Sequence, residues 1–467
     1  MKLKKLYSLP LLAGALLSCS EDFTNLNPVS QRNVNGFYQT AGDMNTAINA
    51  AYKVLQMNGT YNQSYWIMHE MRTDNTDQGP DGTGLGAELT VIDNFSEIAT
   101  SEIITAAYTD SYLGIARSNI VLDRIEAIAM DQATKDRIKG EALFLRSLFF
   151  YNLAVSFGNI PMPLSEAKSA DEGRALPQVP AAEIYRQISA DLLLAEGFLP
   201  VKYAAAADLG RATKGAAAAL LGKVYLTAGD KPSAAAVLKR VVDTYGYSLV
   251  PDYANIWGLT NKNNRESIFE VQYKGGGTGT GNGFTNAFSP LLRQTTGAYK
   301  NRPTIEMMNA YEPGDDRFLK SMDTSYVNAQ GTLLTNSANN VRFITKFGKE
   351  NGFNENDASY NFMVLRYADV LLMLAEALGE SEAAYGYINQ VRARAKLAPI
   401  SASTPGTFAD KLLHERRVEL AFENHRWADL RRFGKVTEVM QAQGKTARPL
   451  YLIPQRELDI NSSYIQN

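Results

Sequence analysis

One segment, residues 134–157, constrains the fold more than any other part of the chain. Its second half, ALFLRSLFFYNLAVSF, is apolar on nearly every side, and Arg146 is its only charge. A helix that is apolar all round is buried all round. Gly158 follows it, with Pro161 and Pro163 just beyond, which predicts the end of the helix. The fold must therefore surround this helix with other structure.

Helical periodicity recurs along most of the chain and predicts a mostly α protein with minor β structure. Between the helices lie two blocks without that pattern, 58–110 and 246–361, and the second holds one clear strand, SIFEVQY. Blocks of this length without helix are usually functional or disordered, and their aromatic content favours function. The helices are expected in three groups, around 112–157, 181–245 and 362–433.

One helical stretch, LGKVYLTAGDKPSAAAVLKRVV, contains a repeat signature. Gly222, Tyr225, Ala234 and Leu238 match the tetratricopeptide pattern, in which a small residue lets two antiparallel helices approach closely. Residues 374–395 form a looser copy. The alternative is two alanine-rich helices that match by coincidence. Stacked repeats of this kind form a curved support and usually bind other proteins.

The N-terminus has the layout of a bacterial lipoprotein signal. Three lysines precede an apolar run at 6–17, and Ser18 precedes Cys19, the only cysteine of the chain. The run is shorter than the roughly 20 residues that span a bilayer, but it suits a signal peptide at 1–18. We therefore expect Cys19 to become acylated and to anchor the chain in a membrane. The alternative is an ordinary cysteine beside a removed leader.

Composition and motifs exclude several functions. A net charge of −2 and a pI near 6.1 argue against a nucleic-acid partner, and a mature chain without thiols cannot form a thiolate metal site. A zinc motif beginning at His414 fails because Val418 holds the second histidine position. A weak calcium candidate combines Asp77, Asp81 and Glu88, although Gly79 and Leu85 remove ligands from the loop. We expect no cofactor.

The most charged helical region is LLHERRVELAFENHRWADLRRFG, residues 412–434. Asp429 lies within helical reach of His425, Arg426 and Arg432. One interpretation is an anion or acid–base site. The favoured interpretation is a lattice of ion pairs that locks helices together.

The same region resembles the closing signature of the SusD/RagB family of glycan-binding outer-membrane lipoproteins. EALFLRSLFFYNLAVSFGNIPMPL, ESIFEVQY and YLIPQRELDINSSYIQN resemble further motifs of that family, so the likeness runs from Cys19 to Asn467. Two departures occur: Asn424 stands where the family usually has glycine, and the chain ends at Asn467 without the frequent proline–glycine–tyrosine tail.

The resemblance implies a single domain, 19–467, whose tetratricopeptide-like helix pairs cap a SusC-like TonB-dependent β-barrel transporter in the outer membrane. The irregular face made by the two inserts would hold an oligosaccharide or other nutrient. Glu21 and Asp22 look like the export signal that places such lipoproteins on the cell exterior. The implied function is non-catalytic binding and delivery of ligand to the transporter.

A glycan site needs exposed rings that stack on the C–H faces of sugars and polar groups that meet hydroxyls. The alternative for each ring is core packing. Two other functions stay open: a lipid-anchored glycoside hydrolase, which would need two carboxylates about 5–10 Å apart, and a helical-repeat scaffold without a sugar site. The residues expected to bind the glycan are Tyr65, Trp66, Asp74, Asn75, Phe284 and Tyr299.

Overall fold

The computed structural model describes residues 37–79, 85–290, 298–328, 330–348 and 356–467. The predicted signal peptide, Cys19, Glu21, Asp22 and the calcium candidate Asp81 lie outside these residues.

The helix expected at 134–157 is α6, Gln132–Phe157, and it is buried as predicted. Every residue from Gly140 to Tyr151 is buried, because α2, α5, α8 and α9 pack around the helix. Arg146 is buried too: it forms an ion pair with Asp191 at 2.8 Å and donates to the side chain of Asn119 at 2.9 Å. Gly158, with φ of 71°, ends the helix.

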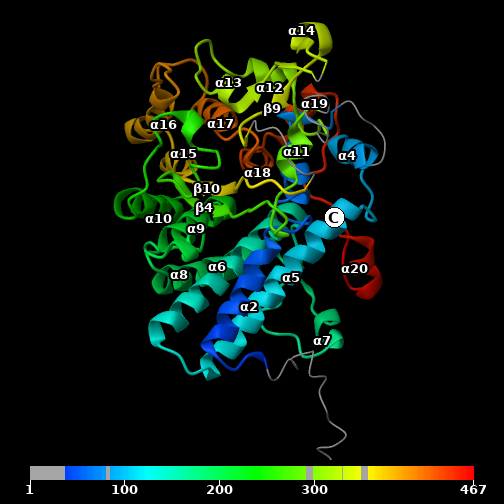
Figure 1. The fold of residues 1–467 in the computed structure, drawn as a ribbon, viewed down its shortest axis with the longest axis vertical. Coiled ribbons are helices and arrows are strands. Elements are labelled where there is room, and N and C mark those ends of the chain that lie inside the picture. The colour runs from blue at the N-terminus through cyan, green and yellow to red at the C-terminus, as the bar shows by residue number, and fades with distance from the viewer. Residues whose placement is uncertain (1–36, 80–84, 291–297, 329, 349–355) are drawn as a thin grey trace, which may run out of the picture.

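The long helices stack in chain order, each against the next, across the lower and left parts of Figure 1. This arrangement confirms a mostly α fold with helix pairs. No helix in the described ranges is long and apolar enough to cross a bilayer. The stacked helices are α2 (Ala41–Val54), α5 (Glu102–Arg124), α6, α8 (Ala181–Phe198), α9 (Lys214–Ala228), α10 (Lys231–Thr244), α15 (Tyr367–Leu378) and α16 (Glu382–Arg394).

The repeat signature corresponds to the α9–α10 hairpin. A Cβ added at Gly222 of α9 would lie 2.4 Å from a terminal methyl carbon of Leu238 on α10, so the two helices meet where the sequence predicted a small residue. Gly229, with φ of 84°, closes α9, and the side chain of Asp230 caps α10 by accepting from the backbone N–H of Ser233.

Helix α5 begins ten residues earlier than expected, at Glu102 instead of Tyr112. The Ser101 side chain accepts from the backbone N–H of Ile104 and marks the start. Glu88 adds a second cap by accepting from the backbone N–H of Ile103 at 3.1 Å. The end of the first insert is therefore part of the helical stack.

Most short elements of the two inserts lie in the upper part of Figure 1, above α2, α5, α6 and α8, whereas β4 lies beside α9 and α10. The strand predicted at 267–273 is β4, which pairs antiparallel with β10. Together with the stack, these elements complete a mostly α fold with minor β. The insert elements include α3 (Ser64–Trp66), the π-helix η2 (Ile67–Met71), β1 (Thr76–Asp77), α4 (Leu85–Asp93), β4 (Ser267–Val271), α11 (Phe284–Phe288), β5 (Arg302–Pro303), α12 (Ile305–Asn309), α13 (Phe318–Ser321), β6 (Met322–Asp323), β7 (Ser325–Val327), β8 (Leu333–Thr335), α14 (Asn336–Asn339) and β9 (Phe343–Ile344). The partner strand β10 (Phe362–Arg366) begins directly after the second insert.

The remaining elements lie outside the inserts and the stack. In Figure 1, α7 and α20 lie low on the side of α5, whereas α17, α18 and α19 lie among the upper elements. They are η3 (Ile125–Ala127), β2 (Ile160–Pro161), α7 (Ala170–Arg174), β3 (Gln178–Val179), η4 (Ala206–Asp208), α17 (Phe408–Glu419), α18 (Arg426–Arg432), α19 (Val436–Ala442) and α20 (Gln455–Ile460).

The charged region 412–434 forms the predicted ion-pair lattice. Glu419 of α17 is fully buried and accepts from Arg317 of the second insert, Arg366 of β10 and Arg394 of α16. Arg416 joins Asp429 of α18 at 2.9 Å and Asp369 of α15 at 2.8 Å. The lattice thus ties α17 and α18 to the helix pairs and to the second insert.

Candidate functional site

The rings predicted to stack on a glycan from the first insert lie in the core. Trp66 is 1% exposed, its ring lies edge-on to Phe288 at 5.1 Å, and its indole N–H donates to the carbonyl of Asn62. Tyr65 is 3% exposed, and its hydroxyl bonds that of Ser111 at 2.7 Å. This placement corrects the prediction of a ring platform, because neither ring offers a face to solvent.

The predicted hydroxyl partners, Asp74 and Asn75, are also buried. The Asp74 carboxylate forms two hydrogen bonds of 2.8 Å with Arg426. Burial opposes ionisation of Asp74, but Arg426 and Arg417 overcome it and lower the pKa of the carboxyl. Asn75 donates to Glu70 and accepts from Arg417. These contacts correct the predicted role: both side chains join the first insert to the charged region.

Phe284 is fully buried as well. Its ring contacts those of Tyr273, Phe288, Phe347 and Phe362, with centroids between 5.4 and 6.0 Å away. The predicted role of Phe284 opposite a bound sugar is therefore corrected to core packing, since an aromatic cluster covers it on several sides.

Tyr299 differs from the other predicted rings because it is only partly buried. Its backbone has φ of 54°, a left-handed conformation that is rare for aromatic residues. The Tyr299 hydroxyl accepts from the backbone N–H of Arg342 at 3.0 Å and lies 3.3 Å from the carbonyl oxygen of Asn340, to which it donates. The guanidinium of Arg302 lies 5.9 Å from the ring centroid. We refer to Tyr299, Asp77, Arg302, Asn340 and Arg342 as the Tyr299 cluster.

Asp77 links the charged members of this cluster. One carboxylate oxygen lies 3.0 Å from Arg302 and the other lies 3.0 Å from Arg342. Strand pairing explains the geometry, because Asp77 of β1 lies directly opposite Arg302 of β5 in the antiparallel register. A Cβ at Gly79 would lie 2.2 Å from the carbonyl oxygen of Tyr299, so the two inserts meet closely there.

The sequence did not identify Arg302, Arg342 or Asn340 as site residues. Asp77 and Arg302 are 225 positions apart, and only the β1–β5 pairing brings them together. The signal that was available is composition, since both segments mix aromatic and polar residues in regions without helical periodicity.

The calcium candidate does not assemble among the described residues. Asp77 is engaged by two arginines, and Glu88 accepts from the Ser101 hydroxyl at 2.7 Å and from the N-terminus of α5. In the described part of the chain no three histidine, cysteine, aspartate or glutamate side chains converge on a common point. The proposed grouping of Asp77 with Glu88 is corrected for this reason.

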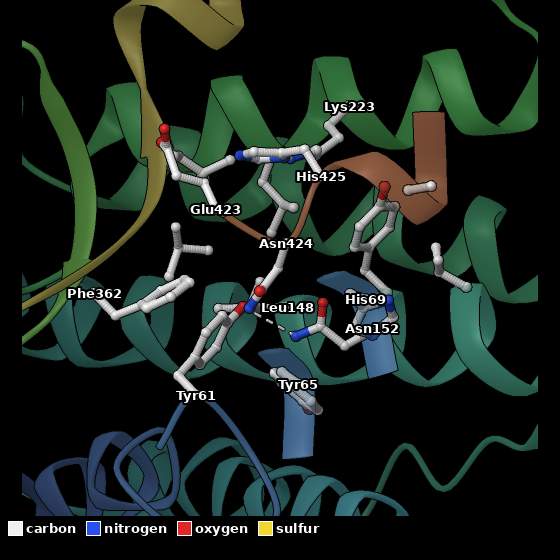
Figure 2. Close-up of a pocket in the computed structure, with 16 residues that line it drawn as sticks. Tyr61, Tyr65, His69, Leu148, Asn152, Lys223, Phe362, Glu423, Asn424 and His425 are labelled. Carbon is white, nitrogen blue, oxygen red and sulfur yellow. Dashed lines mark hydrogen bonds between the residues drawn. The ribbon is translucent and has the colours of Figure 1, made fainter. Parts of the chain in front are cut away.

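A small chamber lies deeper, between α6, α9 and the turn that precedes α18. Figure 2 shows Asn424 projecting toward Tyr61 and Asn152, with His425 beside Lys223. Burial lowers the pKa of His69 to about 3 and that of His425 to about 4. The chamber holds about 50 Å³, room for one or two waters of about 30 Å³, whereas ligand pockets begin near 300 Å³. It is part of the interior and not a glycan site.

The chemistry of the Tyr299 cluster suits recognition of hydroxyl-rich ligands. It combines a partly exposed ring with guanidinium, carboxylate and amide groups, the set that a sugar face and its hydroxyls require. The Asp77 carboxylate accepts hydrogen bonds from Arg302, Arg342 and the backbone N–H of Gly79, so it holds the two arginines in place beside the ring. The cluster is thus suited to binding.

Comparison with known proteins identifies the family. Residues 315–456 match the SusD family, and residues 24–226 match a SusD-like family described as starch-binding and associating with the outer membrane. The chain belongs to the SusD/RagB family. That membership shows association with glycans and with the outer membrane at the level of the family, and it favours binding over catalysis.

Individual SusD-like proteins are similar to this chain along nearly its whole length. The SusD-like protein P2 of Formosa agariphila is 28% identical over 96% of this chain and 93% of its own. A laminarin-binding SusD-like protein is similar in structure, with a TM-score of 0.82 and 29% identity over 92% of this chain and 99% of that one. A SusD superfamily protein from Bacteroides vulgatus has a TM-score of 0.78 and 25% identity, with coverage of 92% and 99%.

Proposed function

We propose that this chain is a non-catalytic, surface-exposed glycan-binding lipoprotein that passes oligosaccharides to a SusC-like TonB-dependent transporter. Family membership supports the binding of a glycan, and the description of that family as associating with the outer membrane supports the location at that membrane. The observation that carries the site is the Tyr299 cluster, a partly exposed ring bordered by Asp77, Arg302 and Arg342. The anchor is Cys19, by the signal layout.

The transporter partner follows from the proposed role. The stacked helices α2 to α16 form a continuous support along the lower and left parts of Figure 1, and most elements of the inserts lie toward the upper right. A helical stack of this type usually binds proteins. One surface can thus contact the barrel while the loop-rich end holds the glycan.

Replacing Tyr299 tests the site directly. Tyr299→Asn removes the ring but keeps a residue that tolerates positive φ, so the backbone of the cluster should persist. Laminarin is the first glycan to test, because a 29% identical SusD-like protein is named for binding it. Loss of one stacking contact should weaken binding about tenfold in calorimetry, which corresponds to about 1.4 kcal/mol.

The matched control is Tyr387→Ala, which removes a half-buried tyrosine from α16 on the helical side. It should leave the dissociation constant unchanged. If a glycan panel that includes laminarin bound equally well to Tyr299→Asn and to the unmodified protein, the Tyr299 cluster would not be the site. Release of reducing ends from the bound polysaccharide would instead support the glycoside hydrolase.

A further inference from the structure

A second cavity lies on a different part of the molecule from the Tyr299 cluster. It holds about 320 Å³ between α5, the segment 160–176 that contains α7, and α20 with the residues that follow it. In Figure 1, α7 and α20 lie low on the molecule, well away from β9 and α14. The volume is at the lower end of the range of small-molecule sites, about 300–1,000 Å³. We call this cavity the α5–α20 pocket.

The walls of the α5–α20 pocket are aromatic and apolar. Met162, Pro163 and Leu176 line it, together with the rings of Tyr108 and Tyr112, whose centroids lie 4.8 Å apart. The ring of Tyr464, from the C-terminal segment, lines it too. Ala116 and Leu164 are exposed at the rim, so the pocket is open to solvent.

The polar groups of the lining have mainly acceptor capacity left. Tyr112 donates its hydroxyl proton to the carbonyl of Pro161 at 2.6 Å, and Tyr464 donates to the carbonyl of Leu176 at 3.0 Å. The side-chain amide of Asn119 donates to the carbonyls of Pro163 and Ser165. A phenol has one proton to donate, so the oxygens of Tyr112 and Tyr464 can only accept a further bond.

Glu457 of α20 adds negative charge to this lining. Its side chain is half-buried in the pocket, and its carboxylate has no ion pair or hydrogen bond within the described residues. Burial and the nearby Glu457 carboxylate both raise the pKa of Tyr108, Tyr112 and Tyr464, so the four groups lie close together. Tyr108 is 2% exposed, and its hydroxyl interacts with that of Tyr112.

We propose that the α5–α20 pocket binds an organic cation, an ammonium or guanidinium group on an apolar stem. Such a group offers only donors and a positive charge, which match the acceptor oxygens and Glu457. Its charge can also lie against the tyrosine faces, and its stem against Met162 and Leu176. A neutral sugar would bring acceptor oxygens, for which the lining keeps few donors because Tyr112, Tyr464 and Asn119 already donate to backbone carbonyls. This site is independent of the proposed glycan site.

The test uses the chain from residue 20 onward and two probes, agmatine for a free amine and N-acetyl-arginine amide for a peptide-borne guanidinium. Both probes should bind in calorimetry. The probe that binds more tightly shows whether the pocket prefers a free amine or a guanidinium carried by a peptide. Pentan-1-ol, an uncharged molecule of similar length, should not bind. Glu457→Gln should weaken binding of the tighter probe by at least about tenfold, and Ala116→Phe, which fills the pocket from its exposed rim, should abolish it.

The matched control is Asp459→Asn, which removes the same charge from α20 at an exposed residue outside the lining. It should leave the affinity within about twofold. Laminarin binding should be unchanged in all these variants, which separates this site from the glycan site. The proposal is overturned if neither probe binds at about 10 mM, if pentan-1-ol binds as well, or if Ala116→Phe and Glu457→Gln bind like the unmodified chain.

Discussion

Glu70 shows how a single buried carboxylate organises the turn between α17 and α18. It accepts from the backbone N–H groups of Phe422 at 3.0 Å and Asn424 at 3.2 Å, both of which have left-handed backbones, and from the Asn75 amide at 2.7 Å. Burial raises the pKa of Glu70 to about 7, and these hydrogen bonds only partly oppose the shift. The turn that carries Asn424 is therefore held by a group that titrates near neutrality.

We predict that Glu70 makes the stability of the protein depend on pH. The pKa of the Glu70 carboxyl is 4.5 in the unfolded chain and about 7 in the folded one. The contribution of Glu70 to the free energy of unfolding is therefore largest below pH 4.5, and it decreases as the pH rises to about 7. Relative to Glu70→Gln, the unmodified chain should lose about 3 kcal/mol across this interval. Urea denaturation at several pH values measures the difference.

The control for that experiment is Glu102→Gln, an exposed carboxylate in the first turn of α5. This variant keeps Glu70, so it should retain the loss of stability between pH 4.5 and about pH 7. A profile of Glu70→Gln parallel to that of the unmodified chain would show that Glu70 does not titrate differently in the folded and unfolded states.

At the scale of elements, adding one methyl group to a helical glycine should change the stability of the protein in opposite directions in α9 and in α16. Gly222→Ala would put a Cβ 2.4 Å from Leu238, so it should destabilise the protein by about 1–3 kcal/mol. Gly386→Ala, in α16 of the looser repeat copy, meets nothing within 4 Å and should stabilise by about 0.5–1 kcal/mol, because glycine is a poor helix residue. Thermal unfolding of both variants measures the two effects.

Equal effects of the two substitutions would contradict the close approach of α9 and α10. Gly386→Ala is itself the matched control, since both changes add one methyl group within a helix.

The helices were predictable from sequence because their signals are local. The apolar surface of α6, the glycine after it and the repeat spacing in α9–α10 each depend on residues within one or two turns. The start of α5 was missed because most of Glu102–Ser111 lies within the block 58–110, whose earlier part lacks helical periodicity. Its cap depends on Glu88, thirteen residues before Ser101, which local periodicity does not reveal.

At the scale of the whole molecule, the site was harder to predict than the fold. Composition correctly indicated that the inserts are rich in rings and polar groups, but it could not show which of them face inward. Asp74 meets Arg426 across 352 positions, and Trp66 meets Phe288 from the other insert. Because of such contacts, residues that have the composition of a ligand site form the core of a loop-rich region instead. Tyr299, which precedes β5, is the predicted ring that stays partly exposed.

The last prediction concerns how the molecule as a whole is held at the membrane. Cys19 lies outside the described residues, and the proposed membrane attachment rests on the signal layout around it, which predicts acyl chains on Cys19. Each buried methylene contributes about 0.8 kcal/mol, and stable anchoring takes two or more chains. Cys19→Ser should therefore move the protein from the membrane fraction to the soluble fraction while laminarin binding by the folded body stays unchanged. Ser20→Ala, beside it, should remain in the membrane. If Cys19→Ser fractionated with the membrane in cells that lack the transporter, the lipid would not be the anchor.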